Sequence, residues 1–204
     1  DKSPKISDAK KTQYKGEAHF LRGLYYFNLV RLFGDVPWID KQQTASDDLQ
    51  VSRTSKDIVY QHIIDDFSDA ASMLPAVYEN TTDIGRATKG AAFGLLAKVY
   101  LTLKRYNETL VAIDSVMNLG VYSLNRKYEW NFSDLRENGP ESLFEVQYEK
   151  DVTAYSEFDI LGQGGWHHEY MAPLASINIG GPWGNFGWFA VYPEFVESYE
   201  PGDL

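Results

Sequence analysis

One segment restricts the fold of this chain more than any other: residues 12–34, TQYKGEAHFLRGLYYFNLVRLFG. Its pattern predicts a helix whose apolar side chains cover nearly the whole circumference. In a water-soluble protein, a helix that is apolar all round has neighbours on several sides. We therefore expect a central buried helix that ends at Gly34, in the C′ position, with Pro37 blocking continuation. Its two arginines, Arg22 and Arg31, are expected to pair with carboxylates or carbonyls of the scaffold.

A second helix is predicted between Thr54 and Pro75. Thr54 and Asp57 have the spacing of a capping box at its start. Apolar residues then recur at intervals of three and four, which gives the helix one apolar face. The three aspartates of this helix are expected to form a solvated surface rather than a cation site: Asp65, Asp66 and Asp69.

Residues 88–119 match the pattern of a tetratricopeptide helix pair. That pattern places a large residue, a small one and then an aromatic in the first helix, and Leu96, Ala97 and Tyr100 occupy these positions. Ala97 would let the two helices approach closely, while Tyr100 and Tyr106 would fill the gap between them. Together with the two preceding helices, this pair predicts a solenoid-like array whose units bury one another's faces.

The sequence changes in character after Gly120, which is expected to end the last helix of the pair. Residues 121–124 (VYSL) and 143–149 (LFEVQYE) read as short strands. Residues 151–193 are rich in glycine and aromatics without a helical period, and a short final helix is predicted from Pro193.

The expected fold is therefore mainly α. Residues 1–120 would form a tetratricopeptide-like helical-repeat scaffold, and residues 121–204 a loop-rich ligand-face segment with short β stretches, both within one domain. Both ends of the sequence look like cuts through a longer chain, so we expect a fragment whose domain is truncated at its C-terminal end.

The charge and motifs of the chain exclude several classes of function. With 29 acidic and 19 basic residues, the net charge of −10 repels phosphate backbones, so no nucleic-acid partner is expected. The absence of cysteine rules out disulfides, thiolate catalysis and zinc fingers. The sequence has no P-loop, dinucleotide fingerprint or nucleophile elbow, and we expect neither a cofactor nor a catalytic residue. No stretch approaches the roughly 18 apolar residues of a membrane helix.

Residues 17–40, EAHFLRGLYYFNLVRLFGDVPWID, resemble the hallmark segment of the SusD/RagB family of nutrient-binding lipoproteins of Bacteroidetes outer membranes. The family pattern runs E-A-x-F-L-R, then a Tyr-Phe run, then L-V-R-x-F-G-x-V-P. Three further segments agree: RATKGAAFGLLAKVYLTLKRY, ESLFEVQY and PEFVESYEPGD. Because family members are considerably longer, the resemblance implies that the signal peptide, the lipid-bearing cysteine, an early helical portion and most of the C-terminal half lie outside this sequence.

The resemblance implies a SusD-like helical scaffold carrying a ligand face. It implies non-catalytic binding of an oligosaccharide or polysaccharide at the cell surface by a protein lipid-anchored in the outer membrane, with a membrane contact only through the missing anchor. It also implies nutrient uptake through a SusC-like TonB-dependent outer-membrane transporter. Two alternatives stay open: a glycoside hydrolase with an acidic aromatic cleft, and a helical-repeat scaffold that binds a protein partner.

Candidate ligand-binding residues lie in two glycine-rich stretches. Sugar rings stack their apolar C–H faces on aromatic rings, and their hydroxyl groups suit planar polar side chains in a largely pre-formed site. The stretch GQGGWHHEY provides Trp166 and His167, and GGPWGNFGWF provides Trp183, Asn185 and Trp188. Alternatively, these tryptophans anchor the loops to the helical scaffold, which the family's Gly-Trp element favours for Trp188.

Two further clusters are interpreted as structural. His167, His168 and Glu169 lack the i, i+4 spacing of an H-E-x-x-H zinc site, so no metal site is expected. Glu194 and Glu197 could be the carboxylate pair of a glycosidase. On a short helix, however, they are better explained as its solvated first turn.

Overall fold

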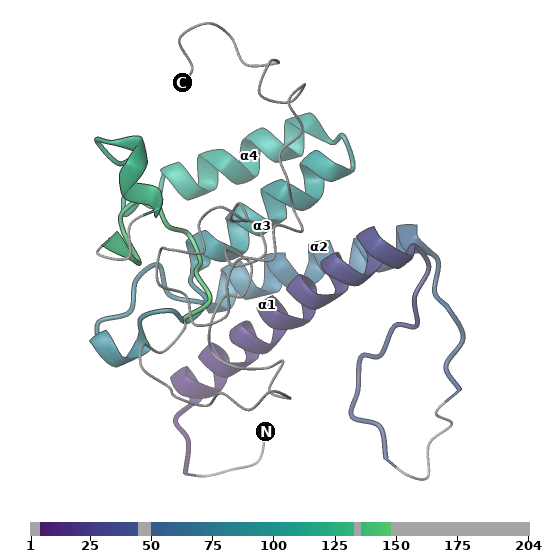
Figure 1. The fold of residues 1–204 in the computed structure, drawn as a ribbon. Helices are drawn as coiled ribbons and strands as arrows, with labels where there is room; N and C mark the ends of the chain where they lie inside the picture. The colour runs from purple at the N-terminus through teal and green to yellow at the C-terminus, as the bar shows by residue number, and fades with distance from the viewer. Residues whose placement is uncertain (1–4, 45–49, 133–135, 148–204) are drawn as a thin grey trace, which may run out of the picture. The chain divides into compact units, whose positions relative to one another are not determined.

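The computed structural model describes residues 5–44, 50–132 and 136–147 (Figure 1). The described residues up to Val146 belong to one compact unit, Asp1–Val146. Its helices, in chain order, are α1 (Asp8–Phe33), α2 (Lys56–Met73), the 3-10 helix η1 (Thr81–Asp83), α3 (Lys89–Thr102), α4 (Tyr106–Met117) and the 3-10 helix η2 (Tyr128–Phe132). The expected mainly α fold is confirmed, while the division expected at residue 120 stays a prediction.

The four α-helices pack in the order of the chain. α1 packs against α2, α2 against α3 and α3 against α4, as in a helical-repeat array (Figure 1). Their facing sides form one hydrophobic core. The largest side chains that are fully buried in it are Phe20, Phe27, Phe67, Ile63, Val59 and Val99.

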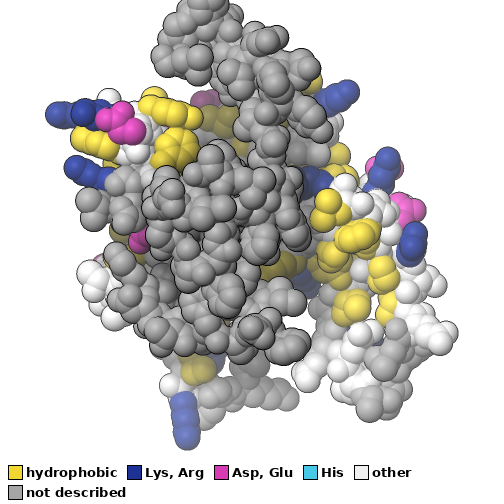
Figure 2. Space-filling model, viewed as in Figure 1, with side chains coloured by type: hydrophobic (Ala, Val, Ile, Leu, Met, Phe, Trp, Pro, Cys, Tyr) yellow, Lys and Arg dark blue, Asp and Glu magenta, His cyan; other side chains and the backbone are white. Residues whose placement is uncertain are grey.

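Helix α1 buries one line of residues rather than its whole surface. That line, spaced by four and three residues, is Gly16, Phe20, Gly23, Phe27 and Val30. Other apolar side chains of the helix are exposed, Leu32 to 75% and Phe33 to 66%. Figure 2 shows hydrophobic side chains gathered on the side of the unit where α1 ends. The expectation of a central helix is wrong for the part of the chain that the structure describes, because α2 is nearly the sole helix there that packs against α1.

Two glycines let α2 approach α1 closely. A Cβ atom at Gly16 would lie 2.9 Å from Met73 Cβ, and one at Gly23 would lie 3.1 Å from the ring of Phe67. These distances are shorter than ordinary packing contacts, so the missing side chains set the spacing of this helix pair.

The loop between α1 and α2 is closed at its base. Gly34 ends α1 with φ +69°, as expected, and its N–H donates to the Val30 carbonyl. The N–H of Thr54 donates to the Val36 carbonyl (2.9 Å), and that of Lys56 donates to Asp35 Oδ1 (2.8 Å). The predicted capping box is wrong, because the carboxylate that caps α2 comes from the far side of this loop.

Asp66 is buried, contrary to the expected solvated surface. Only 2% of it is exposed, and its carboxylate accepts two hydrogen bonds from Arg22, from Nε (2.8 Å) and Nη2 (2.6 Å). His19 Nδ1 lies 2.7 Å from the same carboxylate. The hydrogen bonds with Asp66 raise the pKa of Arg22 above its ordinary value.

Both arginines of α1 have the structural roles expected of them. Arg22 pairs with a carboxylate, as above. Arg31 donates to the Phe27 carbonyl and to Asn28 Oδ1. The contacts of Arg22 join α1 to α2, whereas those of Arg31 stay within α1.

The helix pair α3–α4 confirms the predicted hairpin but only part of its predicted packing. Ala97 is buried between the helices, as expected. Tyr106 is 59% exposed, so the prediction that it fills the gap is wrong. The residues of α4 that are buried are Thr109, Ala112 and Val116. Tyr106 instead begins a second, exposed apolar line along α4 that continues through Leu110, Ile113 and Met117.

The two predicted strands are absent from the described residues. Residues 121–124 and 143–147 form no strand, and the only β pairing in the described ranges is the single bridge at Val36 and Thr54. One backbone hydrogen bond, from the Ser123 N–H to the Pro140 carbonyl (3.0 Å), joins these two regions. Gly120, with φ +66°, follows α4 as expected. None of the described helices combines the length and hydropathy that crossing a membrane requires.

Candidate ligand-binding site

The residues proposed from the sequence as ligand contacts lie outside the described residues. These are Trp166, His167, Trp183, Asn185 and Trp188, and the helix expected from Pro193 lies there too. They stay predictions. The described unit contains a different candidate site, which the sequence analysis missed.

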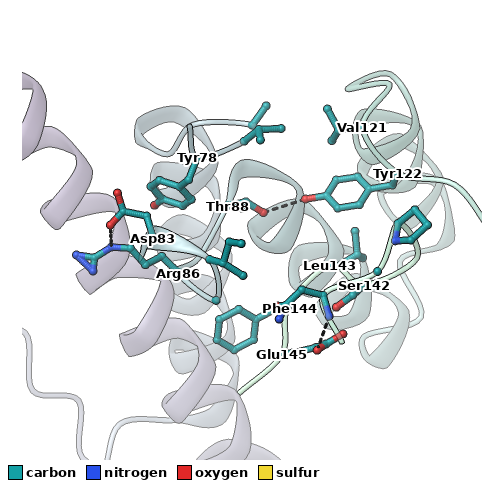
Figure 3. A pocket seen from close by; sticks show the side chains of 17 residues that line it. Tyr78, Asp83, Arg86, Thr88, Val121, Tyr122, Ser142, Leu143, Phe144 and Glu145 are labelled. Atoms are coloured by element: carbon teal, nitrogen blue, oxygen red, sulfur yellow. Dashed lines mark hydrogen bonds and ion pairs between the residues drawn. The ribbon is translucent and has the colours of Figure 1, made fainter. Parts of the chain in front are cut away.

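A pocket of about 250 Å³ lies between the loop that joins α2 to α3 and two segments that follow α4 (Figure 3). We call it the Tyr78 pocket. Its aromatic lining comes from Tyr78, Tyr122 and Phe144, and its charged lining comes from Asp83, Arg86 and Glu145. The polar residues Thr88, Asn138 and Ser142 complete a set of rings and planar or hydroxylic groups around one space.

The start of α3 positions Tyr122. The side chain of Thr88 caps the helix by accepting from the Ala91 N–H (3.1 Å), and its Oγ1 lies 2.9 Å from the Tyr122 hydroxyl (Figure 3). A Cβ atom at Gly90 would overlap the ring of Tyr122. The hydroxyl end of the Tyr122 ring can therefore approach the helix this closely only because residue 90 is glycine.

The opposite wall, formed by residues 138–145, is attached to the helical core. Leu143 packs on Gly94 of α3, where a Cβ atom would lie 2.7 Å from Leu143 Cδ1. The ring of Phe144 packs edge to face against that of Phe20 of α1, with the two ring centres 4.9 Å apart. Glu145 accepts from the Asn138 N–H (3.0 Å), which closes the segment on itself (Figure 3). The loop segments that form the site are thus anchored on α1 and α3.

Arg86 carries the positive charge of the pocket. Its Nε lies 3.3 Å from both Glu17 Oε1 and Asp83 Oδ1. Although these distances make two ion pairs, Nε is buried and forms no hydrogen bond of good geometry in the described structure. Because two carboxylates flank this buried edge, the contacts of Arg86 hold the wall of the pocket and do not offer Nε to a ligand.

Tyr78 is held on the wall next to α1. Its hydroxyl donates to the Ala87 carbonyl at 2.8 Å and lies 3.2 Å from Glu17 Oε1. Burial raises the pKa of Tyr78 well above its ordinary value, and the negative charge of Glu17 raises it further.

Replacement of Tyr78 by phenylalanine is expected to change how stability depends on alkaline pH. The folded protein keeps the Tyr78 proton to higher pH than the unfolded chain, whose tyrosines ionise near pH 10. The unfolded state therefore loses this proton first, and stability falls as the pH rises above about 10. We expect the fall to be less steep in Tyr78→Phe, measured by urea unfolding from about pH 8 to about pH 11.5. Tyr106→Phe, at an exposed position, should keep the wild-type slope, and parallel curves for all three proteins would contradict the prediction.

The chemistry of the pocket suits binding of a polar organic ligand. In the residues that the structure describes, no three His, Asp or Glu side chains are placed to hold a metal ion. The sequence signal for this site was present in the glycines of α3. Gly90 and Gly94, four residues apart, lie on one side of the helix and leave room for side chains from the segments after α4.

Comparison with known proteins places the chain in a family. Residues 2–101 match the SusD-like family that is described as "Starch-binding associating with outer membrane". SusD-like protein P38 of Formosa agariphila is 28% identical over 95% of this chain and 42% of its own length. The crystal structure of a SusD superfamily protein from Parabacteroides distasonis superposes with a TM-score of 0.83 at 30% identity, over 99% of this chain and 42% of that one.

A laminarin-binding SusD-like protein superposes with a TM-score of 0.64 at 28% identity, over 71% of this chain and 32% of that one. The chain thus spans less than half the length of these relatives. The hallmark segment in α1, the helical array and these matches agree, and the chain belongs to the SusD-like family.

Proposed function

We propose that the protein binds an oligosaccharide or polysaccharide at the outer-membrane surface without cleaving it. The observation that carries this proposal is the match of residues 2–101 to a family described as starch-binding and associated with the outer membrane. The laminarin-binding relative supports a glycan as the class of ligand. The Tyr78 pocket adds support, because aromatic rings beside planar polar groups are what sugar rings and hydroxyl groups require.

The pocket supports binding better than hydrolysis. A glycosidase needs two carboxyl groups that flank the scissile bond and have different pKa values. In the Tyr78 pocket, Asp83 pairs with Arg86, and Glu145 accepts a backbone N–H. Both carboxylates hold the walls of the pocket, so a binding role explains them without a catalytic step.

Delivery to a transporter completes the proposal. The protein would be held at the surface by a lipid anchor and would pass its glycan to a SusC-like TonB-dependent transporter. Capture near the pore raises the local concentration of a dilute nutrient, as linked binding sites do in general. Co-purification of such a transporter with the tagged protein from detergent-solubilised outer membranes would support this step, and recovery of the protein alone would count against it.

Affinity electrophoresis tests the binding proposal directly. The intact protein is run through native gels that contain starch, laminarin, xylan or alginate, and each glycan is also incubated with the protein and assayed for new reducing ends. We expect retardation by a neutral glycan with no new reducing ends. Retardation with new ends would establish a hydrolase instead, and normal migration in every gel would remove the support for a glycan ligand.

A further inference from the structure

A second hollow adjoins the Tyr78 pocket. It measures about 170 Å³ and is lined by Trp130, Asn125, Asn131, Arg136 and Glu141. We call it the Trp130 hollow. Gly139, Ser142 and Glu145 line both spaces, so the two meet along the segment that carries these residues.

We propose that the Tyr78 pocket and the Trp130 hollow are two consecutive subsites for a neutral glycan chain, with Trp130 forming one wall of the second. This inference rests on the proposed function. It adds where the ligand binds, how long the ligand must be and which charge it carries. Each space is smaller than the roughly 300–1,000 Å³ of pockets that enclose drug-sized ligands. Each therefore suits one sugar ring, and a chain of two or more rings is needed to use both.

The walls of the Trp130 hollow are mainly polar, and contacts among their side chains hold them in place. The guanidinium carbon of Arg136 lies 4.3 Å from the centre of the Trp130 ring, a cation–π contact that covers one face of the indole and holds the ring against the wall. Asn125 donates from its side chain to Asn131 Oδ1 (2.6 Å) and from its backbone to Glu141 Oε2 (2.8 Å). Side chains that are already held in place lose little conformational entropy when a ligand binds.

The charges around the two spaces favour a neutral ligand. Asp83, Glu141 and Glu145 line them, against Arg86 and Arg136. Arg86 is also countered by Glu17, and the whole chain carries a net charge of −10. A uronic or sulfated chain would enter a region of like charge, which opposes binding.

Oligosaccharides of increasing length test the inference. Laminari- and malto-oligosaccharides of one to six sugar residues are titrated into the intact protein by calorimetry. We expect affinity to rise steeply once the chain is long enough to reach the second subsite. Trp130→Ala should abolish that rise and lower the affinity for the longest oligosaccharide at least tenfold. Ser142→Leu, which places a large side chain where the two spaces meet, should have a similar effect.

The control variant is Tyr128→Ala, in the same 3-10 helix but exposed, which should bind as the wild type does. Thermal unfolding checks that every variant is folded. If the wild type is retarded by a glycan and folded Trp130→Ala binds equally well, the subsite inference fails while the proposed function stands. Affinity independent of chain length, or retardation by alginate in place of the neutral glycans, would also overturn it. A wild type that binds none of these glycans would overturn the function and the inference together.

Discussion

Replacing Asp66 with alanine is expected to lower the free energy of unfolding by about 3 kcal/mol. The carboxylate is buried and receives two hydrogen bonds from Arg22 of α1, with His19 close to one of its oxygens. Its removal leaves a guanidinium without its partner in the α1–α2 interface. The loss is at the lower end of the range for buried pairs, because the side chains of Arg22 and His19 are 31% and 27% exposed and water can rehydrate them.

Urea unfolding of the protein measures this effect, with Asp65→Ala as the matched control. Asp65 is the neighbouring residue, exposed, and accepts one hydrogen bond from Gln61. We expect Asp65→Ala to change stability by less than about 0.5 kcal/mol. Equal losses in the two variants would show that burial of the charge pair does not hold α1 to α2.

Phe20→Ala is expected to cost about 3–5 kcal/mol of stability and to weaken glycan binding. Phe20 is fully buried, and its ring contacts those of Phe67 and Phe144 edge to face. The cavity left by the deletion removes packing from α2 and withdraws the support of the pocket wall that carries Phe144. Both effects come from one side chain, so stability and binding should fall together.

Tyr25→Ala provides the comparison on the same helix. Tyr25 is 64% exposed on the opposite side of α1 from the buried line, so its removal should leave stability within about 0.5 kcal/mol of the wild type. Chemical unfolding and glycan titration are made on both variants. A Phe20→Ala protein that unfolds like the wild type would contradict the assignment of Phe20 to the core.

Local patterns in the sequence predicted the helices well. The apolar spacing in α2 and the residues of the α3–α4 hairpin follow from the geometry of one helix, as do Gly34 and Gly120 in the left-handed region. These features depend on neighbours a few residues away. For that reason a single sequence, without any partner segment in view, is enough to find them.

Features that depend on distant segments could not be predicted in this way. Asp65 and Asp66 are adjacent and identical in type, and only the position of Arg22 on another helix decides which one is buried. Asp35 caps α2 because the loop between them closes at its base. The Tyr78 pocket arises where segments after α4 return to α3 and α1, and the alternation of residues 143–149 indicated strands instead.

The edge-to-face contact of Phe20 with Phe144 affects how the whole unit unfolds. Arrays of helices have mostly local contacts, and they can lose their terminal helices one at a time. Here the first helix touches a segment that follows the last one, so the two ends of the array share an interface. Opening either end breaks that interface, which couples the ends into one cooperative transition. A ligand that binds against Phe144 would then stabilise all four helices by mass action, including those it never touches.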